Sequence, residues 1–301
     1  MALDGIVISS LVKEFNETLT GGKIAKIAQP ENDELLLTIK NFRNQYRLLI
    51  SAGASLPLIY LTGDNKPSPM TAPNFCMLLR KHIANGKILR IWQPGLERII
   101  HFEIEHLNDL GDLCHKVLTV EIMGKHSNII FCDDNNKIID SIKHVGIQMS
   151  SVREVLPGRE YFIPHTQDKE NPLTITEERF RETVLTKPLP LSKALYMTLT
   201  GISPLIAEEI CHRASLESDQ SANSFSDTEA THLYHTFSRL MEDVKNGNFT
   251  PTVVYDGREP LEFSALPLTL YQDKRVETFE SISAVLENYY AMKNTITRIR
   301  Q

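Results

Sequence analysis

The sequence predicts an α+β protein in which an antiparallel, β-rich module is followed by a helical domain. Short runs rich in branched residues, separated by polar turns, recur as far as residue 143, and this pattern is typical of a meander of strands. From Thr174 onward the apolar residues recur at helical spacing instead. A chain of 301 residues, 42% of them hydrophobic, is long enough for about two domains with cores of their own.

The β-rich module is expected to cover residues 1–170. Apolar residues at helical spacing between Ile6 and Leu19 predict a first helix that ends at two glycines, and Thr71 is expected to cap a second helix. Arg43 is expected at the tip of a turn between two strands. Strands are predicted at residues 24–28, 34–40, 46–51, 88–92, 99–105, 117–123, 127–132 and 138–143.

A helical domain is expected over residues 171–250. A Gly-Ile-Ser-Pro turn within it predicts a helix capped by Ser203 with Pro204 at the first helical position. The turn resembles those of the helix-hairpin-helix family, and a compact helical corner explains the pattern equally well. Residues 251–278 regain strand character and are expected to return to the sheet, and residues 279–301 are expected to begin a truncated coiled coil.

Composition excludes several classes of protein. The four cysteines form no Cys-x-x-Cys pair, which argues against a zinc knuckle and a disulfide framework. The first ten residues lack a secretion signal and no apolar run reaches membrane-spanning length, so we expect a cytoplasmic protein with no membrane partner. No histidine shows metal-site spacing and no nucleophile has a base, so we expect no metal, no cofactor and no catalytic residues. His101 and His126 are expected to face solvent or RNA.

Charge is unevenly distributed along the chain, although the net charge is −6. Residues 217–243 are mostly acidic, whereas the basic residues gather in the first half. Such clusters are either solvated faces or the footprint of a polyanion. Residues 80–101 hold one acidic residue against a set of cations, which are Arg80, Lys81, Lys87, Arg90 and Arg98.

Two stretches stand out as candidate binding segments. In the first, Gly124 permits a left-handed backbone and the residues after it offer hydrogen-bond donors that suit phosphate or a base edge. An ordinary hairpin with a solvated turn explains the same spacing. In the second, Glu97 and Arg98 are neighbours, so a turn after Gly95 is needed before both can face one ligand. The first stretch consists of Glu121, Met123, Gly124, Lys125, His126, Ser127 and Asn128.

Several motifs, in their order along the chain, resemble those of the NFACT family. The resemblance extends over essentially all 301 residues and is strongest to the bacterial RqcH-type branch. The chain is thus similar to the N-terminal, NFACT-N part of a longer protein. The motifs are Gln29-Pro30, residues 75–82 (FCMLLRKH), residues 93–98 (QPGLER), residues 121–128 (EIMGKHSN) and Leu156-Pro157-Gly158.

The resemblance implies a role in ribosome-associated quality control. RqcH-type proteins bind a large ribosomal subunit obstructed by peptidyl-tRNA and recruit alanine tRNA, so that the stalled chain receives a C-terminal alanine tail. Glu97 and Arg98 match the family's acidic–arginine pair, which contacts tRNA and often has aspartate at the first position. Residues 121–128 match a second tRNA-facing motif. Further RNA contacts are expected from Arg43, Arg80 and Lys81.

The resemblance also implies an alternative function and a fold. Members of the family were long labelled fibronectin- or fibrinogen-binding proteins, so an adhesin that binds fibronectin or fibrinogen is the alternative. The NFACT-N fold is similar to the N-terminal domain of the formamidopyrimidine-DNA glycosylases. Those enzymes use an N-terminal proline as nucleophile and a cysteine zinc finger. Here Met1-Ala2-Leu3 supplies no such proline, so glycosylase chemistry is not expected.

Overall fold

The computed structural model describes residues 3–164 and 168–300, and for residues 294–298 and 300 it describes the backbone alone. Its dominant feature is an antiparallel sheet of nine strands in the order β4-β3-β2-β1-β5-β6-β7-β8-β9. The predicted meander is therefore confirmed. The strands are β1 (Lys23–Glu31), β2 (Glu34–Asn41), β3 (Asn44–Ser51), β4 (Leu58–Thr62), β5 (Lys87–Trp92), β6 (Ile99–Leu107), β7 (Leu113–Glu121), β8 (Asn128–Asp133) and β9 (Ile138–Ser141).

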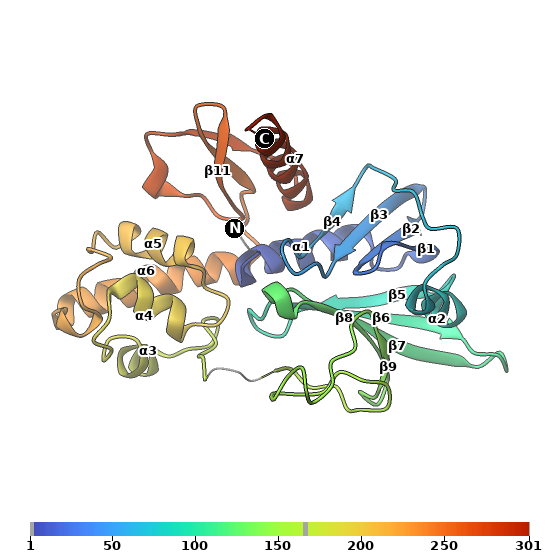
Figure 1. Cartoon of the computed structure of the whole chain (residues 1–301). Coiled ribbons are helices and arrows are strands. Elements are labelled where there is room, and N and C mark those ends of the chain that lie inside the picture. Colours follow the sequence, from blue (N-terminus) through green and yellow to red (C-terminus); the bar gives the residue numbers. More distant parts are fainter. Residues whose placement is uncertain (1–2, 165–167, 301) are drawn as a thin grey trace.

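The sheet divides into two layers. β1 pairs with β5 where Lys23 lies opposite Lys87. The strands on either side of this joint face each other (Figure 1). Side chains at alternate positions point between the layers, which gives each strand one buried face. The main core therefore lies between the layers, and examples from β2 and β6 are Leu35, Leu37, Ile39, Ile100, Phe102 and Ile104.

Two local features differ from the expectation. β4 is absent from the predicted strands, because this short run between Pro57 and Gly63 shows no alternating pattern. The helix cap predicted at Thr71 is wrong. α2 (Asn74–Ile83) begins after Pro73, which occupies the N-cap without a side-chain hydrogen bond. The residue before a proline avoids the helical region, so the helix cannot start at Thr71.

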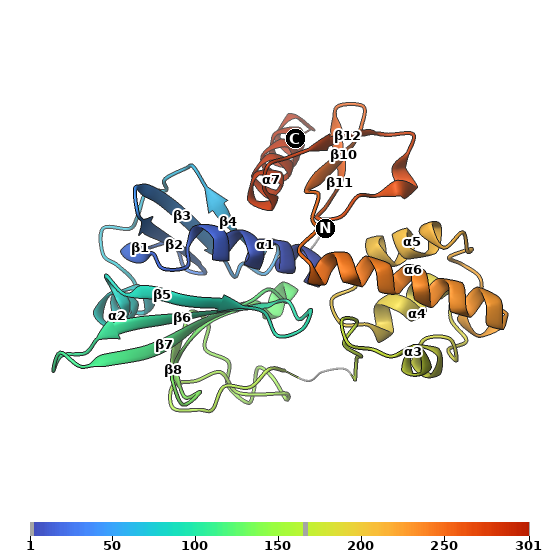
Figure 2. The ribbon, with the colours of Figure 1, turned by 180° about the vertical axis from the view of Figure 1, so that it is seen from behind.

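The first helix, α1 (Gly5–Thr18), lies along the two layers and begins next to the helical domain (Figure 2). Asp4 caps it by accepting a hydrogen bond from the amide of Val7 at 2.8 Å. Its apolar face is buried as predicted, with Ile6, Leu11 and Phe15 at most 1% exposed. α1 therefore connects the sheet to the site where the two domains meet.

The helical domain contains α3 (Glu177–Thr183), α4 (Leu191–Thr198), α5 (Pro204–Arg213) and α6 (Asp227–Lys245). The predicted start of α5 is confirmed, because Ser203 Oγ accepts from the amide of Ile206 and Pro204 occupies the first turn. A capping box formed by Ser226 and Glu229 begins α6. The likeness of the turn before α5 to a helix-hairpin-helix stays a prediction.

Residues 251–278 do not return to the nine-stranded sheet, so that prediction is wrong. They form a separate sheet in the order β11-β10-β12, built from β10 (Thr252–Asp256), β11 (Glu259–Ser264) and β12 (Arg275–Thr278). The physical reason lies at the edge strand β4. The last helix, α7 (Ile282–Arg300), packs beside this edge, and the amide of Leu61 donates to Ser283 Oγ at 2.9 Å.

α7 packs against other elements of the chain itself, which are β4, β10, β11 and α1. Val285 and Leu286 are fully buried, and the ring of Tyr289 packs 4.9 Å from that of Phe263. Farther along, Ile299 is 78% exposed. The segment expected to begin a coiled coil also includes the side chain of Ile296 and residue 301, which lie outside the described part. A coiled coil beginning here stays a prediction.

Three backbone segments touch directly where the two domains join. The amide of Gly5 donates to the carbonyl of Gly201 at 3.0 Å. A Cβ atom on either glycine would collide with the carbonyl oxygen of Leu96, and one on Gly5 would lie 2.8 Å from the Cα of Gly201. Ser203 Oγ also donates to Asp4 Oδ2 at 2.8 Å. We call this contact the glycine junction, and it fixes the Leu96 loop against both domains.

We predict that Gly201→Ala lowers the free energy of unfolding by about 2–5 kcal/mol, because it adds overpacking to a strained backbone. Gly201 has φ +77°, and its new Cβ would meet the Leu96 backbone. The matched control is Gly111→Ala, at φ +83° with nothing within 4 Å, which should cost about 1–2 kcal/mol. Urea unfolding measures both. Equal losses would contradict a steric role for the junction.

Candidate functional site

A cleft of about 570 Å³ opens beside the glycine junction, between the β-rich module and the helical domain. Its walls come from segments far apart in the sequence, which are the loop before β6, the η1 turn (Gly124–His126), the chain after β9 and the edge of the helical domain. The two candidate stretches of the sequence therefore meet in one place. Charged or hydrogen-bonding lining residues include Glu97, Arg98, Lys125, His126, Lys143 and Lys169.

Glu97 and Arg98 both reach the cleft because the chain turns immediately before them. Gly95 has φ +54°, and the amide of Glu97 donates to the carbonyl of Pro94 at 3.0 Å. The side-chain amide of Gln93 donates to the carbonyl of Glu97 at 2.8 Å and so holds the loop. The turn predicted after Gly95 is confirmed, and both neighbouring side chains line the same cleft.

The η1 turn presents two of its side chains to the cleft, and Ser127, which follows it, holds its shape. Gly124 adopts φ +56°, the left-handed region that glycine enters without strain. Ser127 Oγ accepts from the amide of Met123 at 2.8 Å and donates to the carbonyl of Gly124 at 2.7 Å. Ser127 is therefore buried, whereas Lys125 and His126 are more accessible and line the cleft. The segment is a short 3₁₀ turn, tighter than an ordinary solvated loop.

Asn128 positions a lysine that the sequence did not single out. Its Oδ1 accepts from the amide of Lys143 at 3.1 Å, and its Nδ2 donates to the carbonyl of Lys143 at 3.0 Å. Ser141 Oγ donates to the same carbonyl at 2.7 Å. These bonds hold the backbone of Lys143 at the cleft wall. The available signal was the Lys143-His144 pair at the end of a predicted strand.

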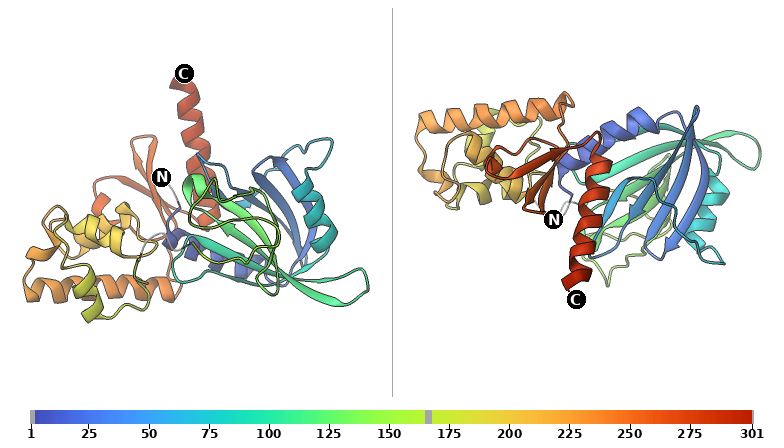
Figure 3. Two further views of the ribbon diagram at one scale, coloured as in Figure 1. Left: turned by 60° about the horizontal axis from the view of Figure 1, so that its bottom comes forward. Right: turned by 90° about the horizontal axis from the view of Figure 1, so that it is seen from above.

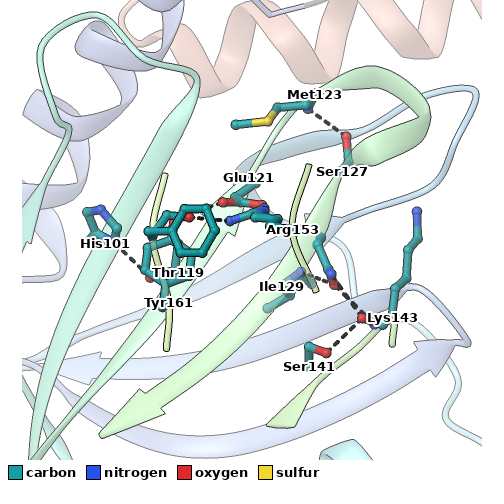
Figure 4. Close-up of polar contacts among 12 residues, drawn as sticks. His101, Thr119, Glu121, Met123, Ser127, Ile129, Ser141, Lys143, Arg153 and Tyr161 are labelled. Atoms are coloured by element: carbon teal, nitrogen blue, oxygen red, sulfur yellow. Dashed lines mark hydrogen bonds and ion pairs between the residues drawn. The ribbon is translucent and has the colours of Figure 1, made fainter. Parts of the chain in front are cut away.

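Glu121 occupies the interior behind the cleft. Its carboxylate is fully buried and pairs with Arg153, whose side chain is 9% exposed, and it also accepts from the Tyr161 hydroxyl at 2.8 Å (Figure 4). Arg153 donates in addition to the carbonyl of Phe162 at 2.7 Å. Burial and the nearby carboxylate raise the pKa of Tyr161, so its hydroxyl keeps the proton that it donates.

The sequence-based expectation that Glu121 faces RNA is therefore corrected by the structure. Both of its oxygens are used inside the protein, where they hold the segment after β9 against β7. Val120 and Ile122 on either side are buried too, but neighbours in a strand point to opposite faces, so they give no signal for Glu121 itself. Arg153 lines the cleft and reaches back to Glu121, and sequence reasoning missed it because it lies outside every motif.

The cleft is predominantly cationic. Among the described residues that line it, Glu97 is the only acidic one. Burial, and secondarily the charge of Arg98, lower the pKa of Lys169, whereas Glu97 opposes this shift. An exposed apolar lip adjoins the cations, with Met149 71% and Val152 45% exposed. Cations beside apolar surface suit a ligand that carries both phosphates and flat bases.

Three expected RNA contacts lie away from the cleft. Arg43 is in the β2–β3 turn, next to the far end of α1, where Asn41 Nδ2 donates to the carbonyl of Thr18 at 2.8 Å. A helix of 14 residues separates this turn from the glycine junction by about 20 Å. Arg80 lies on α2, where its Nε donates to the carbonyl of Ile27 at 2.9 Å, and the exposed Lys81 follows it.

His101 is buried, so the expectation that it faces solvent or RNA is wrong. It lies 8% exposed between the rings of Trp92 and Tyr161, at 5.0 and 6.0 Å, and its Nδ1 bonds to Thr119 Oγ1 at 2.8 Å. Burial, and secondarily the charge of Arg90, lower the pKa of His101 to about 4. The neutral ring therefore belongs to the core of the sheet.

In residues 3–164 and 168–300, no group of three or more His, Cys, Asp or Glu side chains is arranged to hold a metal ion. Within the same described part of the chain, no helix is both long enough and apolar enough to cross a membrane.

The model of the NFACT N-terminal and middle domains matches residues 4–301. The Rqc2 homolog RqcH of Bacillus subtilis is 37% identical over 303 residues, which cover 100% of this chain and 51% of that protein. The Rqc2 homolog RqcH of Streptococcus suis is 31% identical, covering 100% of this chain and 50% of that protein. Human ribosome quality control complex subunit NEMF is 24% identical, over 67% of this chain and 18% of its own length. The chain spans about half the length of the RqcH proteins that it matches.

Solved structures share the fold. The fibrinogen binding protein from Staphylococcus aureus matches with a TM-score of 0.80 and 30% identity, covering 96% of this chain and 99% of that one. The N-terminal part of the fibronectin/fibrinogen-binding protein from Streptococcus suis matches with a TM-score of 0.79, at the same identity and coverage. The MutM (Fpg) protein of Thermus thermophilus is far less similar, with a TM-score of 0.42 and 11% identity, over 90% of this chain and 85% of that one. The expected likeness to the glycosylases stays a prediction.

We predict that Arg153→Met lowers the free energy of unfolding by about 3–5 kcal/mol, because it leaves the Glu121 carboxylate buried without its cation. The double variant Glu121→Gln/Arg153→Met should lose less than the single variant, since no buried charge remains. Arg159→Met is the matched control, because Arg159 is 62% exposed and pairs with Glu154 at 2.8 Å. That control should cost under about 1 kcal/mol. Equal losses for Arg153→Met and the control in urea unfolding would refute the buried pair's role.

We predict that His101 makes stability fall as the pH falls below its ordinary pKa of 6.5. Its folded-state pKa of about 4 is lower, so the unfolded chain binds more protons between these values. Between a pH of about 7.5 and a pH of about 5 the loss should approach 2 kcal/mol. His101→Gln should remove this part of the pH dependence, and His126→Gln, on the η1 turn, should not. An unchanged pH dependence in His101→Gln would contradict the account.

Proposed function

The chain belongs to the family of the NFACT N-terminal and middle domains, and from that premise we propose that it binds tRNA in ribosome-associated quality control. The RNA is held in the cleft beside the glycine junction. As part of a longer protein like the RqcH relatives, the chain would act on large ribosomal subunits that carry peptidyl-tRNA, in the cytoplasm. Binding of alanine tRNA there would support the addition of a C-terminal alanine tail to the stalled chain.

The observation that supports this proposal most is the convergence of Glu97 and Arg98 in one cationic cleft. An arginine can pair with phosphate through two N–H groups or stack on an unpaired base. A neighbouring carboxylate can accept a hydrogen bond from an exposed base amino group. Contacts to phosphate alone cannot distinguish one base from another. Lys125, Lys143 and Lys169 line the same cleft as this pair. The cleft can therefore hold a backbone and examine a base at the same time.

The proposed mechanism is binding and positioning, with no catalytic residue in this chain. Peptide bond formation would remain with the ribosome, and the chain would keep the tRNA in place. The η1 turn supplies Lys125 and His126 for RNA contacts, and the buried Ser127 keeps that turn rigid. A rigid site loses less conformational entropy when the RNA binds, and this increases affinity.

A second candidate is the adhesin, and the names of the similar structures favour it. These proteins from Staphylococcus aureus and Streptococcus suis are called fibrinogen-binding and fibronectin/fibrinogen-binding. The cationic cleft does not require a protein partner, whereas its chemistry matches RNA well. Binding of fibronectin that is indifferent to the cleft residues would favour this second candidate.

We predict that Arg98→Ala weakens binding of alanine tRNA by about 1–3 kcal/mol, the range for losing a bidentate or stacked arginine. The measurement is a fluorescence titration with labelled tRNA at fixed salt, because phosphate contacts make affinity depend on salt. Arg239→Ala is the matched control, since Arg239 lies on α6, away from the cleft. An unchanged affinity in a folded Arg98→Ala variant would sink the proposed role.

A further inference from the structure

We propose that the chain has a second RNA-binding surface, where β1, β2 and β5 meet at the β2–β3 turn. It consists of Phe42, Arg43 and a set that we call the lysine ladder, made of Lys23, Lys40 and Lys87. The surface would bind an RNA phosphate backbone and stack on an unpaired base. It is separate from the cleft, because the length of α1 keeps the two about 20 Å apart. Figure 3 shows the strands that carry it from two further directions.

The lysine ladder places like charges side by side. Lys23 is directly opposite Lys40 on β2 and directly opposite Lys87 on β5, and all three side chains are exposed. Residues opposite each other in antiparallel strands point to the same face at close spacing, and like charges there are destabilising. Among the described residues, none of the three lysines forms an ion pair. Glu105 is opposite Lys87 but pairs with His115 at 3.2 Å.

The β2–β3 turn adds a second, independent feature at the same end of the sheet. Phe42 is 100% exposed and has φ +54°, a left-handed conformation that bulky residues rarely adopt. A fully exposed ring gains nothing from burial, so neither its position nor its backbone favours folding. Arg43 follows it and is exposed as well. Both the turn and the ladder therefore cost stability in the isolated chain, and a bound ligand would offset that cost.

The chemistry of the two features favours RNA. Closely spaced ammonium groups attract a chain of phosphates and release its counterions. An exposed aromatic ring beside an arginine is the arrangement that stacks on unpaired bases in single-stranded nucleic acid. An acidic protein segment would satisfy the lysines but offers no flat ring for Phe42. The choice of RNA also rests on the proposed function of the cleft.

The test uses the whole chain and a fluorescein-labelled, single-stranded RNA of mixed sequence and about 20 nucleotides, long enough for typical site sizes. Fluorescence anisotropy is measured for Lys23→Gln/Lys40→Gln/Lys87→Gln and for Phe42→Gly. The matched control is Lys13→Gln/Lys245→Gln/Lys274→Gln, which removes the same charge from three lysines that pair with Glu17, Glu242 and Asp256. Labelled poly-L-glutamate is titrated in parallel.

The ladder variant should lose about tenfold or more in RNA affinity, and the control variant should lose much less. Phe42→Gly should bind several-fold more weakly while its Tm stays the same or rises, because glycine accepts φ +54° without strain. Phe42→Tyr should bind like the original chain, because it keeps a ring that can stack.

Three results would overturn the proposal. They are unchanged RNA affinity in the ladder variant, a lower Tm in Phe42→Gly, and binding of poly-L-glutamate as tight as that of RNA and insensitive to Phe42.

The cleft variant Glu97→Ala/Arg98→Ala separates the two surfaces. It should keep most of its affinity for this single-stranded RNA even if it loses tRNA. If the ladder variant loses RNA binding and the cleft variant keeps its affinity for both RNA and tRNA, this surface is supported and the proposed function of the cleft is not.

Discussion

The glycine junction is the constraint on which the rest of the structure depends. Gly5 begins α1, Gly201 lies in the turn before α5, and the backbone of Leu96 passes them at a distance that no side chain would allow. The loop with Glu97 and Arg98 follows directly, so its position is set by backbone contact with both domains. The polar groups at this contact are already paired with each other. Moving the two domains relative to one another would therefore break these hydrogen bonds.

The opposite wall of the cleft depends on a buried charge pair. Arg153 crosses from the segment after β9 to Glu121 on β7, and Tyr161 completes the pairing of that carboxylate. Pairs of this kind contribute little net stability, but one partner left alone is costly, so they specify a single arrangement of the chain. Asn128 holds the same segment at Lys143. Glu121 and Asn128 thereby position a cleft wall that consists mostly of the segment after β9.

Much of the fold follows from local patterns, and its departures have tertiary causes. The turn after Gly95 and the start of α5 follow from Pro-Gly and Ser-Pro signals. By contrast, residues 251–278 look like returning strands, because no local pattern reveals that α7 covers β4. At the site, residues of both candidate stretches line the cleft, but the sequence does not predict Arg153, because ion pairs between distant segments leave no spacing signal. The assignment of Glu121 to RNA rests on the resemblance, and its buried position follows from Arg153 and Tyr161, which come from a distant segment.

The most direct test of the central claim is hydrogen–deuterium exchange of the chain with and without alanine tRNA. If the cleft holds the RNA, amides should be protected together in the loop before β6, the η1 turn, residues 143–153 and the turn at Gly201, which line it from both domains. Protection confined to other surfaces, with the loop of Glu97 and Arg98 unchanged at saturating tRNA, would contradict the account.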